Sequence, residues 1–308
     1  MFGLTILGNN SAIPAFDRHP TAQALMHDDQ VFLIDCGEGT QMQLARYKIR
    51  RSKINHIFIS HLHGDHYFGL IGVITSMGLL GREEALFIYG PGLLKEIILL
   101  QLRAADTLLK FPLHFIIIKE ATVLLRTGKM EVSCFPVKHR VECWGYLFRE
   151  QKPPRKLNRE KAIENGIPAV FFNRLQMGEH YETKSGNIIA NDMVTYTNDP
   201  GRSYAFCADT LFDPGLGEWI SGVNLLYHEA TYLSDLEQRA AERYHSTAKQ
   251  AAMMAGYANA NQLIIGHFSS KYQDLTAFET EAQSIFPKTQ LALEGTTFRI
   301  LHSTKSSY

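Results

Sequence analysis

Short runs of β-branched and aromatic residues alternate with longer apolar or amphipathic runs along most of the chain. The first kind of run is typical of buried strands and the second of helices. Three strand–helix pairs are expected early in the chain, namely residues 31–35 with 40–48, 54–59 with 67–80, and 86–89 with 93–103. Because strands and helices follow one another in this order, the pattern predicts an α/β fold.

The second part of the chain begins with a β-rich stretch and then returns to alternating elements. Strands are expected at residues 113–118, 121–125, 131–137, 144–148, 204–207, 223–227 and 263–265. A helix is expected at residues 247–258, and a further helix and strand complete the C-terminus. Two β-rich halves with helices outside them predict a single domain over residues 1–308, a sandwich of two sheets between two helix layers.

Residues 151–199 interrupt this rhythm. Pro153 and Pro154 stiffen the entry to the stretch, and Asn158 and Pro168 each stand where a short helix can begin. We interpret the stretch as an arm inserted into the domain. A peripheral subdomain without a binding partner fits the same pattern about equally well, so the sequence leaves that alternative open.

The densest group of chemically reactive side chains follows the second expected strand. His61, His63, Asp65 and His66 lie where that strand gives way to a helix. His61 and His63 are two residues apart on extended chain, so both imidazoles can face one ion. Asp65 and His66 leave the turn at Gly64 in other directions and suit a second ion. Because a carboxylate among three histidines is costly to bury without a cation, the motif predicts a metal site.

Three further residues that can bind a metal ion also follow expected strands, on segments distant in the sequence. His139, Asp209 and His267 each come shortly after an expected strand. Any one of them alone would be explained by capping or surface polarity. With the cluster they make a sulfur-free set of histidines and aspartates, which suits catalytic zinc, with manganese as the second option. Asp209 has two oxygens and can bridge two ions about 3.5–4 Å apart.

Composition and charge limit the class of protein and its location but do not identify a function. The chain has 308 residues, of which 45% are hydrophobic and 20% charged, an ordinary balance for a globular protein. Its formal net charge of zero argues against indiscriminate nucleic-acid binding. The four cysteines are scattered, and neither a signal peptide nor a membrane-spanning run is apparent. We therefore expect a reduced, cytoplasmic protein with no membrane contact.

The metal motif and several other stretches resemble the metallo-β-lactamase superfamily over nearly the whole chain, and within it the ribonuclease Z family most closely. The other matching stretches are Leu7-Gly8, Ser11-Ala12-Ile13-Pro14, residues 33–41, Lys138-His139-Arg140-Val141, Gly145-Tyr146, His228-Glu229-Ala230-Thr231 and His245-Ser246-Thr247. The resemblance implies an αββα sandwich with an inserted arm, two zinc ions per chain, and a homodimer. It also implies cleavage of precursor tRNA just after the discriminator nucleotide.

The family's roles carry over to individual residues of this chain. They place His61, His63 and His139 on one zinc ion, Asp65, His66 and His267 on the other, and Asp209 on both. Asp65 also resembles the family's proton acceptor. His245 is our candidate proton donor to the leaving 3′-oxygen, with Glu229 orienting its imidazole. Helix N-terminal polarity for His245 and a buried salt bridge for Glu229 are the alternative explanations. Because water attacks, the expected products are a 3′-hydroxyl tRNA and a 5′-phosphate trailer.

Two basic clusters offer contacts for phosphate groups. One lies at the base of the arm and consists of Lys152, Arg155, Lys156, Arg159 and Lys161; the other consists of Arg46, Lys48, Arg50, Arg51 and Lys53. Charge runs are usually solvated faces, but the resemblance favours RNA binding by the arm cluster. The chain departs from the family pattern at Ala208, where glycine is usual, at Lys271, where arginine is usual, and in the arm, which lacks a Gly-Pro step.

Two other functions share most of these features. Another superfamily hydrolase, acting on small phosphodiesters or thioesters, would use the same metal ligands. The arm and the segment at residues 245–247 favour the nuclease over this hydrolase. A non-catalytic RNA-binding relative is the alternative of another class. Such relatives commonly lose ligands, whereas all seven expected ligands are present in this chain.

Overall fold

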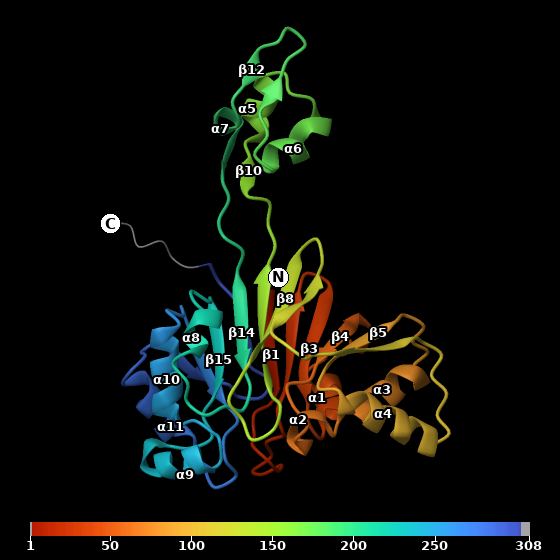
Figure 1. The fold of residues 1–308 in the computed structure, drawn as a ribbon, viewed down its shortest axis with the longest axis vertical. Helices are drawn as coiled ribbons and strands as arrows, with labels where there is room; N and C mark the ends of the chain where they lie inside the picture. The colour runs from red at the N-terminus through yellow and green to blue at the C-terminus, as the bar shows by residue number, and fades with distance from the viewer. Residues whose placement is uncertain (1, 303–308) are drawn as a thin grey trace.

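Two large β-sheets pack face to face in the computed structural model, which describes residues 2–302 (Figure 1). The first sheet contains, in spatial order, β18 (Thr297–Arg299), β1 (Phe2–Gly8), β2 (Ala22–His27), β3 (Gln30–Cys36), β4 (Ile54–Phe58), β5 (Leu86–Gly90) and β6 (Leu113–Ile117). The second contains β17 (Thr289–Leu291), β16 (Leu263–Gly266), β15 (Leu225–Glu229), β14 (Ser203–Cys207), β9 (Trp144–Glu150), β8 (Met130–Pro136) and β7 (Thr122–Arg126).

Helices cover the outer face of each sheet. Those beside the first sheet are α1 (Thr40–Arg46), η1 (Arg51–Lys53), α2 (Gly64–Tyr67), α3 (Leu70–Leu79) and α4 (Leu93–Ala104). Those beside the second are α8 (Leu216–Trp219), η3 (Ser234–Leu236), α9 (Glu237–Glu242), α10 (Ala248–Tyr257) and α11 (Thr276–Gln283). The order of layers is therefore helix, sheet, sheet, helix, which confirms the predicted αββα sandwich.

Aromatic side chains fill the space between the two sheets. Phe58 of β4 lies with its ring centroid 4.5 Å from that of Tyr89 in the same sheet. The same ring is 5.3 Å from Phe148 of β9 in the opposite sheet. All three side chains are almost fully buried, so the two sheets share one core. A second cluster of buried aliphatic side chains joins the first sheet to its helices.

The predicted helix at residues 67–80 is wrong at its beginning. The structure has the short helix α2 over Gly64–Tyr67, then a break, and α3 starts only at Leu70. The break occurs because the Gly69 N–H donates to the Cys36 carbonyl at the end of β3, at 2.9 Å. A Cβ at Gly69 would lie 2.1 Å from the Gly37 carbonyl oxygen, so glycine permits this close approach.

The sequence pattern assigned no strand to residues 22–27, which form β2. This segment, Ala-Gln-Ala-Leu-Met-His, lacks the β-branched and aromatic residues that favour strands. It pairs antiparallel with β1 on one side and with β3 on the other. Tertiary pairing on both edges thus overrides the local preference of the segment.

The stretch at residues 151–199 extends away from the sandwich (Figure 1). Its elements are β10 (Arg155–Leu157), α5 (Arg159–Glu164), η2 (Ala169–Phe171), α6 (Phe172–Gln176), β11 (Tyr181–Glu182), β12 (Ile188–Ile189), α7 (Asn191–Val194) and β13 (Thr195–Thr197). It has a small core of its own, made by Ala162, Ile167, Leu175 and Val194. A turn at residues 184–187 joins β11 to β12. No helix of the described part of the chain is long and apolar enough to span a bilayer.

His56 on β4 makes the stability of the sandwich depend on pH. Its ring lies 5.8 Å from Phe32 and 5.3 Å from Phe87, centroid to centroid. Burial, and secondarily Arg82, lowers the pKa of His56 to about 4. As the pH falls, His56 therefore becomes protonated near pH 6.5 in the unfolded chain but only near pH 4 in the folded chain. We expect the free energy of unfolding to fall across that window, by about 1–2 kcal/mol after allowance for partial exposure of the ring.

A His56→Phe variant isolates this contribution. It keeps the stacked row of rings and removes the titrating group, so its free energy of unfolding should fall less than that of the unmodified protein between pH 6.5 and 4. Urea denaturation at several pH values measures both slopes. Equal slopes for the two proteins would show that His56 does not titrate in this range.

Candidate metal centre

Seven side chains that the sequence marks as metal ligands meet at one end of the sandwich. Their donor atoms form two groups in which all atoms lie within 4.8 Å of one another. One group is His61, His63, His139 and Asp209; the other is Asp65, His66, Asp209 and His267. All seven lie in loops that follow strands or in the first turn of α2, because the ends of β4, β8, β14 and β16 converge at this point.

Asp209 belongs to both groups and lies between them. Its Oδ1 is 3.2 Å from His267 Nε2, and its Oδ2 is 3.4 Å from His66 Nε2 and 3.7 Å from His61 Nε2. The residue is 2% exposed. This is the placement that a bridging ligand needs, and bridging by Asp209 stays a prediction.

The arrangement of the donor atoms suits binding of a divalent cation better than hydrogen bonding among themselves. His61 Nε2 lies 3.0 Å from His63 Nδ1, and His63 Nδ1 lies 3.2 Å from His139 Nε2. Three imidazole nitrogens thus face one point, where at most one of each pair can donate a proton to the other. Asp209 Oδ1 is buried and accepts no hydrogen bond from the described residues. Nitrogen and carboxylate donors without sulfur suit zinc or manganese.

Groups behind the ligands fix which nitrogen each histidine presents. Asp35 Oδ2 lies 2.7 Å from His66 Nδ1, and Thr231 Oγ1 lies 2.9 Å from His267 Nδ1. The Tyr244 carbonyl accepts from His139 Nδ1 at 3.0 Å. Each of these three rings therefore turns its Nε2 toward the cluster, which is how such outer hydrogen bonds orient metal ligands. No role was expected for Asp35 or Thr231 from the sequence, although Asp35 also stands at the end of a strand.

Electrostatics keeps the first group of histidines neutral. Burial lowers the pKa of His61, His63 and His139. The Asp209 carboxylate acts in the other direction and raises the pKa of all three, but burial outweighs it. Neutral imidazole is the form that binds a metal ion, so the histidines of this group can receive a cation without first losing protons. His66 in the other group differs: burial alone would lower its pKa, but the carboxylates of Asp209, Asp65 and Asp35 raise it well above the usual value.

The proposed acid–base groups lie beside the cluster. Glu229 is fully buried and accepts from His245 Nδ1 at 2.8 Å, from the Thr210 N–H at 3.1 Å, and from both Thr231 donors. Burial alone would lower the pKa of His245, but the Glu229 carboxylate raises it to about 9. Asp65 Oδ2 accepts from the Ala12 N–H at 2.7 Å. The structure thus places Glu229 where it can orient His245; the catalytic roles of all three stay predictions.

A cleft of about 700 Å³ opens over the cluster. Its lining includes His63, Asp65, His139, Asp209 and His245 together with loop residues 11–14 and 269–271. The α9 side contributes Arg239 and Arg243, which the sequence pattern did not single out.

The five basic residues proposed for RNA binding lie on the arm, away from this cleft. Lys152 pairs with Glu150 at 3.4 Å, and the Arg155 Nε donates to Thr195 Oγ1 at 2.9 Å. Lys156, Arg159 and Lys161 are exposed. The structure therefore leaves three of the five free to meet a ligand, and their contact with RNA stays a prediction.

Known proteins resemble this chain both in sequence and in fold. Residues 2–140 match the family described as Anti-Pycsar protein Apyc1. The human tRNase Z short form superposes with a TM-score of 0.70 at 24% identity, covering 97% of this chain and 99% of that one. The metallo-β-lactamase fold protein YhfI of Bacillus subtilis gives 0.67 at 18% identity, covering 96% and 98%. Fold and site together define a metallo-β-lactamase-fold protein with a His/Asp site for divalent metal.

Curated relatives narrow this class. Ribonuclease Z of Bacteroides fragilis strain YCH46 is 43% identical over 296 residues, 96% of this chain and 97% of that protein. Ribonuclease Z of Cytophaga hutchinsonii is 44% identical over 314 residues, 99% of each. The chain belongs to the ribonuclease Z family. It is therefore an endoribonuclease, a hydrolase of phosphodiester bonds.

Proposed function

We propose that this endoribonuclease removes the 3′ trailer from precursor tRNA, leaving a tRNA with a 3′-hydroxyl and a trailer with a 5′-phosphate. The observation that carries the proposal is the pair of His/Asp groups sharing Asp209 beneath an open cleft. The chain also belongs to the ribonuclease Z family, and its fold is that of a human protein named tRNase Z. We assign tRNA as the substrate because of this likeness to tRNase Z.

Two divalent ions per chain, zinc or manganese, are part of the proposal. His61, His63 and His139 would hold one ion, and Asp65, His66 and His267 the other, with Asp209 shared. The bound cations would neutralise charge on the scissile phosphate and make the attacking water easier to deprotonate.

Protein side chains supply the proton transfers. Burial by itself raises the pKa of Asp65, but His66 and His267 beside it hold that pKa well below its usual range. Asp65 is therefore ionised and available to accept a hydrogen bond from the attacking water. His245 is held through Nδ1 by Glu229, so its Nε2 is free to deliver a proton to the departing 3′-oxygen.

A His245→Ala variant separates the proton donor from the metal ligands. We expect single-turnover cleavage of precursor tRNA to slow by about 10²–10⁴-fold, the usual value of general acid–base catalysis, because the leaving oxygen loses its proton source. Elemental analysis should find unchanged metal content. A near-normal chemical step in this variant would assign His245 to structure alone.

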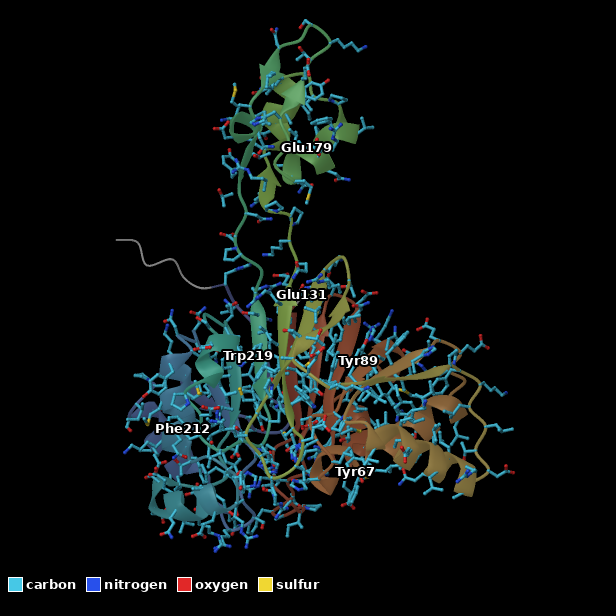
Figure 2. All side chains as sticks on the ribbon, in the orientation of Figure 1. Tyr67, Tyr89, Glu131, Glu179, Phe212 and Trp219 are labelled. Atoms are coloured by element: carbon cyan, nitrogen blue, oxygen red, sulfur yellow. The ribbon has the colours of Figure 1, made fainter. Side chains whose placement is uncertain are left out.

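The arm and an assembly of two chains belong to the same proposal. The first residue of β9, Trp144, lies beside the ligands, because its N–H donates to the Ser60 carbonyl. The arm begins after the last residue of β9, Glu150, and therefore at the far end of that strand. Figure 2 accordingly shows Glu179 of the arm at the opposite end of the molecule from Tyr67, which follows the ligands of α2. A second chain offers a way to bring an arm near a substrate bound in the cleft.

Exposed apolar residues support a homodimer. Exposed leucines lie at the C-terminal end of α3, on α4 and in the loop after α4; they are Leu79, Leu80, Leu93, Leu99, Leu100 and Leu108. Exposed apolar groups of this kind mark protein interfaces. Sedimentation velocity should give the mass of a dimer, and a monomer at micromolar concentration would contradict this part of the proposal.

The cytoplasm is the proposed location. All four cysteines are buried free thiols, which is the usual state in a reducing compartment.

The decisive experiment is incubation with a labelled precursor tRNA that carries a 3′ trailer, followed by end-group analysis. We expect one cut after the discriminator nucleotide and loss of cleavage after chelation of divalent metal, restored by zinc or manganese. Cleavage of a small phosphodiester but not of the precursor would favour a small-substrate hydrolase. Binding of the precursor without cleavage would favour a non-catalytic relative.

A further inference from the structure

Two arginines on α9 form a cationic edge of the cleft. Arg239 lies within the helix and Arg243 directly follows it. Residues four apart lie on the same side of a helix, so both side chains leave α9 on one side. Both line the cleft over the metal cluster, and both are exposed.

The acidic residues of α9 do not neutralise these arginines. Glu242 accepts from Gln238 Nε2 at 3.1 Å, and Glu237 accepts from Gln250 Nε2 at 3.0 Å. Across residues 2–302, neither Arg239 nor Arg243 has an ion-pair or side-chain hydrogen-bond partner. Glu38 lines the same cleft and forms no ion pair with either arginine. Two uncompensated positive charges therefore border the place where a phosphodiester must enter.

The chain continues from these arginines into the catalytic site. Tyr244, with φ of +60°, turns the backbone so that its carbonyl accepts from His139 Nδ1 at 3.0 Å. His245 comes next and is held by Glu229. Arg243 is thus two residues from the group that we assign to the leaving oxygen. Because the leaving oxygen is the 3′-oxygen of the tRNA, this edge faces the tRNA side of the cut.

The part of the lining that comes from the side of the first sheet is different in character. Ile13, in the loop after β1, and Phe68, directly after α2, line the cleft and are exposed by 55% and 61%. Apolar and aromatic groups suit the faces of nucleobases, whereas guanidinium groups suit phosphate oxygens. The cleft therefore has one edge for the backbone of a nucleic acid strand and another for its bases.

We infer that Arg239 and Arg243 bind backbone phosphates of the last nucleotides of the mature tRNA, just 5′ of the scissile bond. This inference rests on the proposed function and adds a specificity element to the same site. The arginines hold the acceptor strand so that its terminal 3′-oxygen lies at His245, and they do not contact the trailer.

The test compares a double variant, Arg239→Gln with Arg243→Gln, with a matched control, Arg50→Gln with Arg299→Gln. The control removes the same charge from two exposed arginines outside the cleft. We expect kcat/KM on precursor tRNA to fall about 10- to 100-fold in the cleft variant and less than about threefold in the control. The log–log salt dependence of binding should flatten by about 0.7–0.9 for each phosphate group that the variant no longer binds. Arg239→Lys with Arg243→Lys should restore most of the activity, because the charge is retained.

Two further measurements assign the effect. Hydrolysis of bis(p-nitrophenyl) phosphate should fall at least tenfold less than tRNA processing in the cleft variant, with metal content unchanged. The defect on tRNA should persist when the trailer is cut to one nucleotide; a defect that disappears with that substrate would place the arginines on the trailer and overturn the inference. Equal loss on both substrates, or no loss on tRNA, would also overturn it. Failure of the unmodified protein to cleave precursor tRNA would instead reject the proposed function.

Discussion

Asp209→Ala is expected to abolish cleavage of precursor tRNA, with a loss of at least about 10⁴-fold in rate, or roughly 5 kcal/mol of transition-state stabilisation. Both oxygens of Asp209 face the cluster, and the residue belongs to both groups of donors. Its removal leaves each group one ligand short. Elemental analysis of the purified variant should find at most one ion per chain, against about two in the unmodified protein.

A suitable control is Asp29→Ala, which removes a carboxylate that is 77% exposed and only 3.7 Å from Lys53. Its activity and metal content should equal those of the unmodified protein. Asp209→Ala protein that keeps both ions would rule out the bridge. Active unmodified protein without any transition metal would reject the metal centre altogether.

Replacing the arm by a short Gly-Ser linker is expected to reduce kcat/KM on precursor tRNA by about 10²-fold or more. Remote binding energy aligns the reacting phosphate, so its loss lowers turnover as well as affinity. The structure shows where to cut: the Asn198 N–H donates to the Pro154 carbonyl at 3.0 Å, so residues 155–197 can be removed between two adjacent points. Because the arm has its own core, the sandwich should stay folded.

Hydrolysis of a small chromogenic phosphodiester should be retained in this deletion, since all seven expected ligands lie outside the arm. A narrower variant neutralises only the exposed Lys156, Arg159 and Lys161, and should weaken tRNA binding with a flatter salt dependence. Neutralising three residues of the other basic cluster, Arg46, Lys48 and Arg50, is the matched control. Normal tRNA processing by the deletion variant would show that the arm is not needed for the reaction.

Most of the fold could be predicted from the sequence because the strands of the sandwich carry strong local patterns. The β4 segment carries two isoleucines and a phenylalanine, and it lies as a strand within one residue of its expected end. β2 could not be predicted, because its composition carries no strand signal and only pairing with β1 and β3 makes it one. The start of α3 also depends on a distant partner, the Cys36 carbonyl that holds Gly69.

The identities of the candidate ligands were readable from the sequence, since histidine and aspartate at strand ends are an unusual and chemically specific combination. Which groups stand behind them was not readable. Asp35 reaches His66 across 31 positions of the chain, and the Tyr244 carbonyl reaches His139 across 105. Such contacts depend on how distant segments pack together, and sequence spacing carries no record of them.

The sequence by itself thus determined the αββα class and the set of candidate donors, because both follow from local side-chain chemistry and hydrophobic periodicity. It predicted an inserted arm but left a peripheral subdomain without a partner as an equal alternative. Only the tertiary structure decided that the donors form two groups around Asp209, that the arm leaves the end of the sandwich remote from them, and that Arg239 and Arg243 border the cleft. These are relations between segments far apart in the chain, and they are set by long-range burial of apolar surface and pairing of strands.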